Sequence, residues 1–142
     1  RKACALENDG SVWCWGRGNR GQLGNNDTSN NVSTPVQVLT YDGATNPPLA
    51  NATAIGVGSS HSCAIAGSVY CWGNNKDGEL GYATSQSSVA LKTNPEITNA
   101  ASLTVFAHST CAVLTTGALR CWGLRADNMS TGAPLAVPAF EP

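Results

Sequence analysis

Six cysteines are the residues whose chemistry and spacing are most informative in this chain of 142 residues. Structural zinc sites usually place paired cysteines roughly two to four residues apart. Here the partners have 9, 7 and 9 residues between them, in the pairs Cys4 and Cys14, Cys63 and Cys71, and Cys111 and Cys121. The spacing therefore favours three disulfides, which form in oxidising compartments. The alternative interpretation is six free buried thiols in a cytosolic protein.

Two histidines and nine scattered carboxylates are the other candidates for catalysis or metal binding. His61 and His108 each follow a short β-like run, so we expect them to occupy one repeated position and to hydrogen-bond to neighbouring backbone. The alternating acidic series typical of a calcium loop is missing, and no nucleophile has an evident base beside it. The sequence therefore predicts no catalytic residue, no metal ligand and no cofactor.

These residues are positioned by a repeat, since a Cys-Trp-Gly triplet occurs three times. Self-similarity of this kind is typical of repeat architectures. A Gly-X-Leu-Gly motif begins six residues after the first two triplet tryptophans, whereas the third copy has Asn-Met-Ser-Thr at residues 128–131. We expect structural roles within the repeat for Trp15, Gly16, Gly21, Leu23, Gly24, His61, Trp72, Gly73, Gly78, Leu80, Gly81, His108, Trp122 and Gly123.

Each cysteine pair brackets a predicted β-hairpin. Pairing Cys4 with Cys14 leaves Asn-Asp-Gly at residues 8–10 as a three-residue loop, and such loops place glycine last, in a left-handed conformation. Residues 115–117 repeat this pattern, and the shorter middle hairpin leaves residues 66–68 as its loop. Side chains alternate along a strand, and both faces of the second hairpin strands are apolar or aromatic. Sheets buried on both sides are what radially stacked propeller blades require.

The remaining strands complete an all-β fold of propeller blades with four antiparallel strands each. An earlier strand is predicted at residues 54–57 and 103–106, and a proline-led fourth strand at residues 35–38, 95–97 and 134–137. Blade 1 covers residues 1–50 with a long loop and lacks its first strand, blade 2 covers residues 51–99, and blade 3 covers residues 100–142. Because propellers use about four to eight blades, we expect the rest of the ring to come from a longer chain or from neighbouring chains.

Three segments resemble the regulator of chromosome condensation repeat: Gly-Ser-Ser-His-Ser-Cys-Ala-Ile at 58–65, Gly-Ser-Val-Tyr-Cys-Trp-Gly at 67–73 and Gly-Glu-Leu-Gly at 78–81. The resemblance covers nearly the whole chain and weakens after Gly123. It implies a propeller of about seven blades that presents loops from a rigid disc. Members include an exchange factor for a small GTPase, a plant light sensor, ubiquitin-ligase subunits and bacterial inhibitors of β-lactamase. The cysteines make this chain similar to bacterial secreted or cell-surface versions.

Composition narrows the range of partners. The net charge is −1 and only 12% of residues are charged, which leaves no basic surplus for nucleic acid. No apolar run is long enough for a membrane-spanning helix, so we expect no membrane insertion. The Asn-rich segment 25–51 is either a partner-binding loop or a solvated variable loop. Candidate glycosylation acceptors in Asn-X-Ser/Thr triplets are Asn26, Asn31, Asn51 and Asn128.

Taken together, these features predict a non-catalytic extracellular propeller scaffold, secreted or at the cell surface. Its expected partner is a protein, a glycan or a further copy of the chain. One alternative is a structural subunit of a surface fibre or sheath, suggested by the low charge and the incomplete ring. A second alternative is a secreted enzyme inhibitor, which requires one loop cluster unlike the others.

Overall fold

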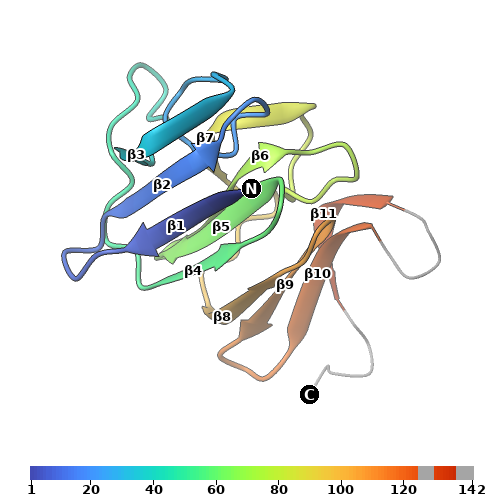
Figure 1. Ribbon diagram of the computed structural model, residues 1–142. Helices are drawn as coiled ribbons and strands as arrows, with labels where there is room; N and C mark the ends of the chain where they lie inside the picture. The colour runs from blue at the N-terminus through green and yellow to red at the C-terminus, as the bar shows by residue number, and fades with distance from the viewer. Residues whose placement is uncertain (125–129, 137–142) are drawn as a thin grey trace.

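The computed structural model describes residues 1–124 and 130–136, and all its regular elements are β-strands (Figure 1). They form three antiparallel sheets, one in each predicted blade. No helix long and apolar enough to cross a membrane occurs in the described part of the chain. The strands are β1 (Lys2–Leu6), β2 (Val12–Arg17) and β3 (Asn31–Gln37) in blade 1; β4 (Ala54–Val57), β5 (His61–Ala66), β6 (Ser68–Asn74) and β7 (Gln86–Lys92) in blade 2; β8 (Ala100–Val105), β9 (Ser109–Leu114), β10 (Leu119–Leu124) and β11 (Ser130–Ala136) in blade 3.

Each sheet is a meander in which strands consecutive in the chain are also hydrogen-bonded neighbours. The first strands of blades 2 and 3, β4 and β8, lie against each other, and β1 lies against β4. The three sheets are therefore stacked with these edges together, as propeller blades are. The all-β propeller class predicted from the sequence is confirmed.

The hairpin registers agree with the sequence prediction. In all three blades the two cysteines are direct cross-strand partners, as for Cys4 and Cys14. Gly10 and Gly117 close the outer two hairpins with φ angles of 84° and 88°, the left-handed conformation expected for the last loop residue. The middle turn is tighter than predicted, because Ala66 and Ser68 are already strand partners and only Gly67 lies between them.

The fourth strand of blade 2 is a correction to the sequence prediction. In blade 1, Cys14 pairs with Val36, so the predicted run 35–38 lies largely in β3. In blade 2, Cys71 pairs with Leu91 instead, and the strand is β7 at residues 86–92. Residues 95–97, predicted as the fourth strand, follow it instead, because the proline there does not mark the same register as Pro35. In blade 3, residues 134–136 belong to β11, and residue 137 lies outside the described residues.

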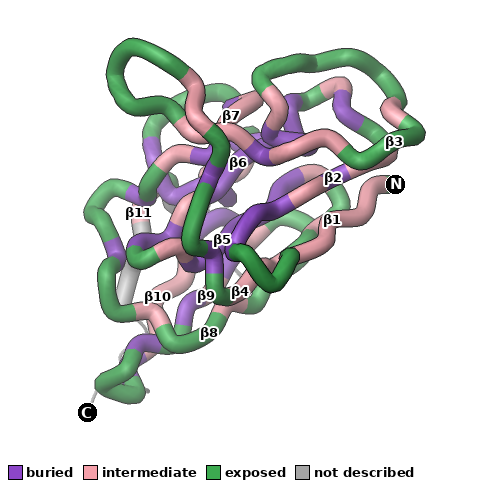
Figure 2. Tube along the Cα trace, turned by 90° about the vertical axis from the view of Figure 1, so that its left-hand side faces the viewer, coloured by how far each residue is buried: buried purple, intermediate pink, exposed green. Residues whose placement is uncertain are grey.

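The hydrophobic core lies between the sheets and divides into two clusters. One cluster joins blades 1 and 2 and includes Val12, Cys14 and Trp72. The other joins blades 2 and 3 and includes Cys71 and Trp122. Figure 2 shows the buried residues gathered along the strands of the middle blade. Burial on both faces, predicted for every blade, therefore holds for the two central strands of blade 2, β5 and β6.

Blade 1 is buried on one face only. Val12 and Cys14 are completely buried on the side that faces blade 2, whereas Trp13 and Trp15, which alternate with them along β2, are partly exposed. For this sheet the second buried face stays a prediction, because no described element packs on its Trp13 side.

Candidate functional site

The chemically distinctive residues of the chain gather at the two junctions between blades. Each disulfide locks one hairpin that contributes a face to a junction. All three pairs predicted from spacing are bonded, with Cα atoms 4.1 Å apart in each case, and no described cysteine is free. Closing loops of this size contributes about 2 to 3 kcal/mol per bridge in the chain-entropy account.

The junction of blades 1 and 2 is built around Trp72. Its indole is completely buried, and Nε1 donates a hydrogen bond to the backbone carbonyl of Gln22 at 3.1 Å. That carbonyl belongs to the Gly-Gln-Leu-Gly loop at residues 21–24. A Cβ at Gly24 would lie 3.0 Å from both Cδ1 and Nε1 of Trp72. The glycine thus allows the loop backbone to lie directly against the edge of the indole, so the loop and the tryptophan form one packing unit.

The junction of blades 2 and 3 repeats the packing but changes the hydrogen bond. A Cβ at Gly81 would lie 3.0 Å from Nε1 of Trp122, so the same loop position lies against the next tryptophan. The equivalent carbonyl, that of Glu79, accepts a hydrogen bond from the Thr110 hydroxyl at 2.9 Å. The buried Trp122 indole N–H has no hydrogen-bond partner among the described residues. The two junctions share their packing, and only the first uses the indole as a donor.

The glycine of each Cys-Trp-Gly triplet allows the backbone at the start of the preceding strand to approach closely. A Cβ at Gly73 would lie 2.5 Å from the carbonyl oxygen of Ser60, and φ at this glycine is 109°. Gly16 and Gly123 show the same close approach and positive φ. Each triplet also coincides with a register shift toward the following strand. The predicted structural roles of these three glycines therefore have a common cause.

The loop at the second junction is held by buried amide and carboxylate groups. The Glu79 carboxylate accepts hydrogen bonds from Asn74 Nδ2 at 2.6 Å and from the backbone N–H of Asp77 at 2.9 Å. Burial is the main influence on this carboxyl group and raises its pKa. Asn75 donates to two carbonyls and accepts from the backbone N–H of Leu80. In blade 1 the buried Gln22 takes the position of Glu79, and its side chain accepts from a backbone N–H at 2.6 Å.

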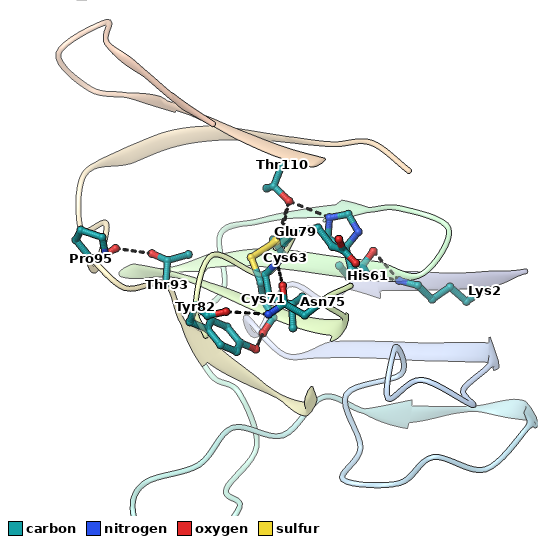
Figure 3. The surroundings of a disulfide bond; sticks show 12 residues. Lys2, His61, Cys63, Cys71, Asn75, Glu79, Tyr82, Thr93, Pro95 and Thr110 are labelled. Atoms are coloured by element: carbon teal, nitrogen blue, oxygen red, sulfur yellow. Dashed lines mark hydrogen bonds between the residues drawn. A yellow bond between two sulfur atoms is a disulfide. The ribbon is translucent and has the colours of Figure 1, made fainter. Parts of the chain in front are cut away.

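His61 links blade 2 to blade 3 through a side chain rather than through the backbone acceptor we expected. Its Nε2 lies 2.8 Å from Thr110 Oγ1 (Figure 3). Because the Thr110 hydroxyl donates to Glu79, it accepts from His61, which places the imidazole proton on Nε2. Burial, together with the charge of Lys2, lowers the pKa of His61 to about 3. The ring is therefore neutral at physiological pH.

His108 does not occupy the same position as His61, and this prediction was wrong. The backbone N–H of Gly58 donates to His61 as that of Phe106 donates to Ser109, so Ser109 is the counterpart of His61. A shift of one residue along a strand turns the side chain to the opposite face. The His108 side chain is accordingly 52% exposed, and its Nδ1 lies 3.2 Å from the Asp77 carboxylate.

Lys2 is the functional counterpart of His61 in blade 1 and was missed in the sequence. Lys2 pairs with Gly16 as His61 pairs with Gly73, and its Nζ donates to the carbonyl of His61 at 3.1 Å and contacts Ser62 Oγ. Burial lowers the pKa of the Lys2 ammonium to about 7. The position two residues before the first cysteine of each pair was the available signal: in blades 1 and 2 its side chain reaches toward the next blade.

Three of the four candidate glycosylation acceptors are accessible. Asn26, Asn31 and Asn51 are exposed, and Asn26 and Asn51 have positive φ angles. Asn128 lies outside the described residues. Whether these side chains carry glycans stays a prediction. Within the described residues no group of three or more His, Cys, Asp and Glu side chains is arranged to hold a metal ion.

Comparison with known proteins finds a family that matches part of the chain. Residues 9–65 match the family described as the Regulator of chromosome condensation (RCC1) repeat. The matched segment is similar to an RCC1 repeat. It runs from the turn of the first hairpin to β5, so the RCC1 unit spans one blade junction and is out of phase with the sheets.

Relatives with RCC1 repeats extend the match along the chain. The chain is 33% identical over 141 residues to the protein pim1 of Schizosaccharomyces pombe, covering 92% of this chain and 24% of pim1. It is 42% identical over 72 residues to an RCC1 domain-containing protein of Dictyostelium discoideum, covering 49% of this chain and 14% of that protein. The chain thus spans about a quarter or less of these curated relatives.

The solved structure of Prp20p from Saccharomyces cerevisiae superposes with a TM-score of 0.78 at 20% identity. The superposition covers 96% of this chain and 36% of Prp20p. At this identity the likeness shows the fold, which is that of an RCC1-like propeller.

Proposed function

We propose that the chain is a non-catalytic binding scaffold of an oxidising, extracellular compartment and that its partner is a protein. The observation that carries the proposal is how the chain uses its reactive groups. All six cysteines are in disulfides. The buried imidazole of His61, the buried carboxylate of Glu79 and the ammonium of Lys2 are each engaged within or between blades. These described groups, which could act as nucleophile, base or ligand, are engaged in structural contacts instead.

The disulfides support the proposed compartment. Each bridge joins directly opposed strand residues, and two of the three cysteine pairs have at least one fully buried member. Bridges that are part of a packed core persist in secreted proteins and are rare where thiols are kept reduced. A stapled propeller of this kind suits an environment without reducing agents.

A protein partner is supported by what RCC1-like propellers of known structure bind. Prp20p of yeast has been described with its binding properties to Gsp1p and histones, and has been solved with Kap60 bound. These partners are not carried over to this chain, because the likeness is one of fold. What is carried over is the class of partner, since such discs bind other proteins through their loops.

The segment that follows β3 is the loop that we propose as the contact region. Tyr41 is 52% exposed, and the loop around it is ordered by Asp42, whose carboxylate accepts from the backbone N–H of Ala44 and Thr45. Thr40 anchors the same loop to blade 2, with its hydroxyl 2.8 Å from the carbonyl of Ala90. A tyrosine held out on a rigid loop is a typical interface anchor.

Two measurements test the proposal. Thiol titration of the unfolded, unreduced protein should detect no free thiol, and six thiols would overturn the extracellular assignment. A photo-crosslinking residue at position 41 should capture a protein partner in the native host. The matched control is the same residue at Phe106, which is equally exposed at 52% but lies on blade 3. Capture of a glycan, of further copies of the chain alone, or of nothing at position 41 would contradict the proposed partner class.

A further inference from the structure

The loop that carries Tyr41 is closed by hydrogen bonds within itself. The backbone N–H of Thr40 donates to the carbonyl of Pro47 at 2.8 Å, and the backbone N–H of Asp42 donates to the carbonyl of Thr45 at 3.1 Å. Tyr41 and Asp42 are both exposed between these bonds. Because the backbone that presents them is already ordered, a partner that binds here has little conformational freedom left to remove.

Asp42 presents an ionised carboxylate at the surface. Its Oδ1 accepts from the backbone N–H of Ala44 at 2.9 Å and of Thr45 at 2.6 Å, and its Oδ2 accepts from the Thr45 hydroxyl at 2.8 Å. These bonds, the backbone bond from Thr45 above all, lower the pKa of Asp42, so the group is charged at neutral pH. Among the described residues it forms no ion pair.

The two ends of the blade 1 strands carry opposite charge. The turn between β1 and β2 carries Glu7 and Asp9. The backbone N–H of Ala52 donates to the carbonyl of Gly10 at 3.0 Å, so the segment after β3 lies against this turn (Figure 1). The basic residues of blade 1 lie at the other end of its strands: Arg1, Lys2, Arg17 and Arg20. No Lys or Arg occurs between residues 21 and 75. The end that bears the Tyr41 loop therefore attracts cationic groups.

Blade 2 shows how a tyrosine and a carboxylate hold a cation in this protein. The Nζ of Lys92 lies 3.1 Å from the Glu96 carboxylate and 6.0 Å from the centre of the Tyr70 ring. A cation is attracted to an aromatic face at distances up to about 6 Å. Tyr41 and Asp42 offer the same two groups at adjacent positions, and no cation of the described residues is paired with either of them.

We propose that the protein partner presents a lysine or arginine side chain, from a basic segment of its surface, to Tyr41 and Asp42. The cation lies over the tyrosine ring and pairs with the carboxylate, as Lys92 does with Tyr70 and Glu96. The inference rests on the function proposed above, because it specifies the chemistry of the partner at the same loop. It also explains why an exposed tyrosine stands beside a carboxylate that the chain leaves unpaired.

A defined peptide tests the preference of the loop for a cation. The probe is a fluorescent polyarginine peptide, and its neutral counterpart has citrulline in place of arginine. Fluorescence anisotropy at low ionic strength should detect binding of the arginine peptide only, and added salt should weaken it. Asp42→Asn keeps Oδ1 as acceptor for the loop and removes the charge, so it should weaken binding about two- to fivefold. Tyr41→Leu should have an effect of about the same size.

Asp27→Asn is the matched control, because it changes the net charge equally at the other end of the strands. Asp27 is also exposed, and its carboxylate accepts from the backbone N–H and the hydroxyl of Ser29 at 3.1 and 2.7 Å. Its substitution should leave the affinity unchanged. All variants are produced without N-glycosylation and should keep the urea midpoint of the parent chain. Absence of binding, or equal weakening by the two Asp→Asn substitutions, would overturn the proposal.

The crosslinking experiment at position 41 separates this inference from the proposed function. The captured protein is digested with a protease that does not cleave at Lys or Arg, and the linked peptide is sequenced by mass spectrometry. We expect Lys or Arg residues to flank the linked position. A protein captured through a segment without Lys or Arg would overturn this inference and leave the proposed function standing. Capture of no protein would overturn both.

Discussion

Replacing Gly24 with alanine should destabilise the chain through the Trp72 junction. At Gly24 the φ angle is 72°, and a Cβ would lie 3.0 Å from Trp72 Cδ1, Trp72 Nε1 and Val38 Cγ1. Left-handed backbone costs an alanine about 1 to 2 kcal/mol, and forcing an extra carbon into a packed core costs about 1 to 3 kcal/mol. The expected loss in the free energy of unfolding is therefore about 2 to 5 kcal/mol, the sum of the two effects.

Gly67→Ala is the matched control, because it separates the two effects. Gly67 has nearly the same φ angle, 76°, but nothing lies within 4 Å of the position of its Cβ. Its substitution should cost only the conformational part, about 1 to 2 kcal/mol. Alanine restricts the unfolded chain equally at both sites, so this entropic contribution cancels when the two variants are compared.

Urea unfolding followed by tryptophan fluorescence measures both variants. The loss in the free energy of unfolding should be about 1 to 3 kcal/mol larger for Gly24→Ala than for Gly67→Ala. The dependence of this free energy on urea concentration should not change. Equal losses in the two variants would refute the account of the junction, since they would show that the indole edge tolerates a methyl group.

Three further predictions concern the disulfide, the buried histidine and the buried carboxylate. The double variant Cys63→Ser/Cys71→Ser should lose about 2 to 3 kcal/mol of stability by urea unfolding; unchanged stability would show that the bridge adds nothing to its hairpin. Because the folded pKa of His61 is about 3 and the usual value is 6.5, the unfolded state binds more protons between these values. Stability should therefore fall as the pH drops from 6.5 toward 3, by up to ~1.4 kcal/mol per pH unit, and an equally steep fall in His61→Gln would assign the effect to other groups. Glu79→Gln keeps an acceptor oxygen for only one of the two donors that bind Glu79 and should cost about 1 to 3 kcal/mol. Glu79→Leu leaves both donors, Asn74 Nδ2 and the Asp77 N–H, without an acceptor and should cost more; equal losses would contradict the bonding described.

The sequence was sufficient to predict the fold class, the hairpins and the disulfides. These features depend on pairing between residues close in the chain. Once Cys4 is placed opposite Cys14, the alternation of side chains and the glycine at the end of the loop determine the neighbouring pairs. The junction residues Trp72 and Gly24 could also be predicted as structural, because they recur at fixed spacing.

Tertiary structure alone decided the fourth strand of blade 2 and the links between blades. The fourth strand is reached through a loop whose length differs from blade to blade, so Pro95 could not mark its register. The different position of His108 could have been predicted, because it stands three residues before Cys111 whereas His61 stands two residues before Cys63. The bonds from Lys2 to His61, and from His61 to Thr110, join residues 59 and 49 positions apart. Such contacts depend on how whole sheets stack, and the local pattern of residues does not carry that information.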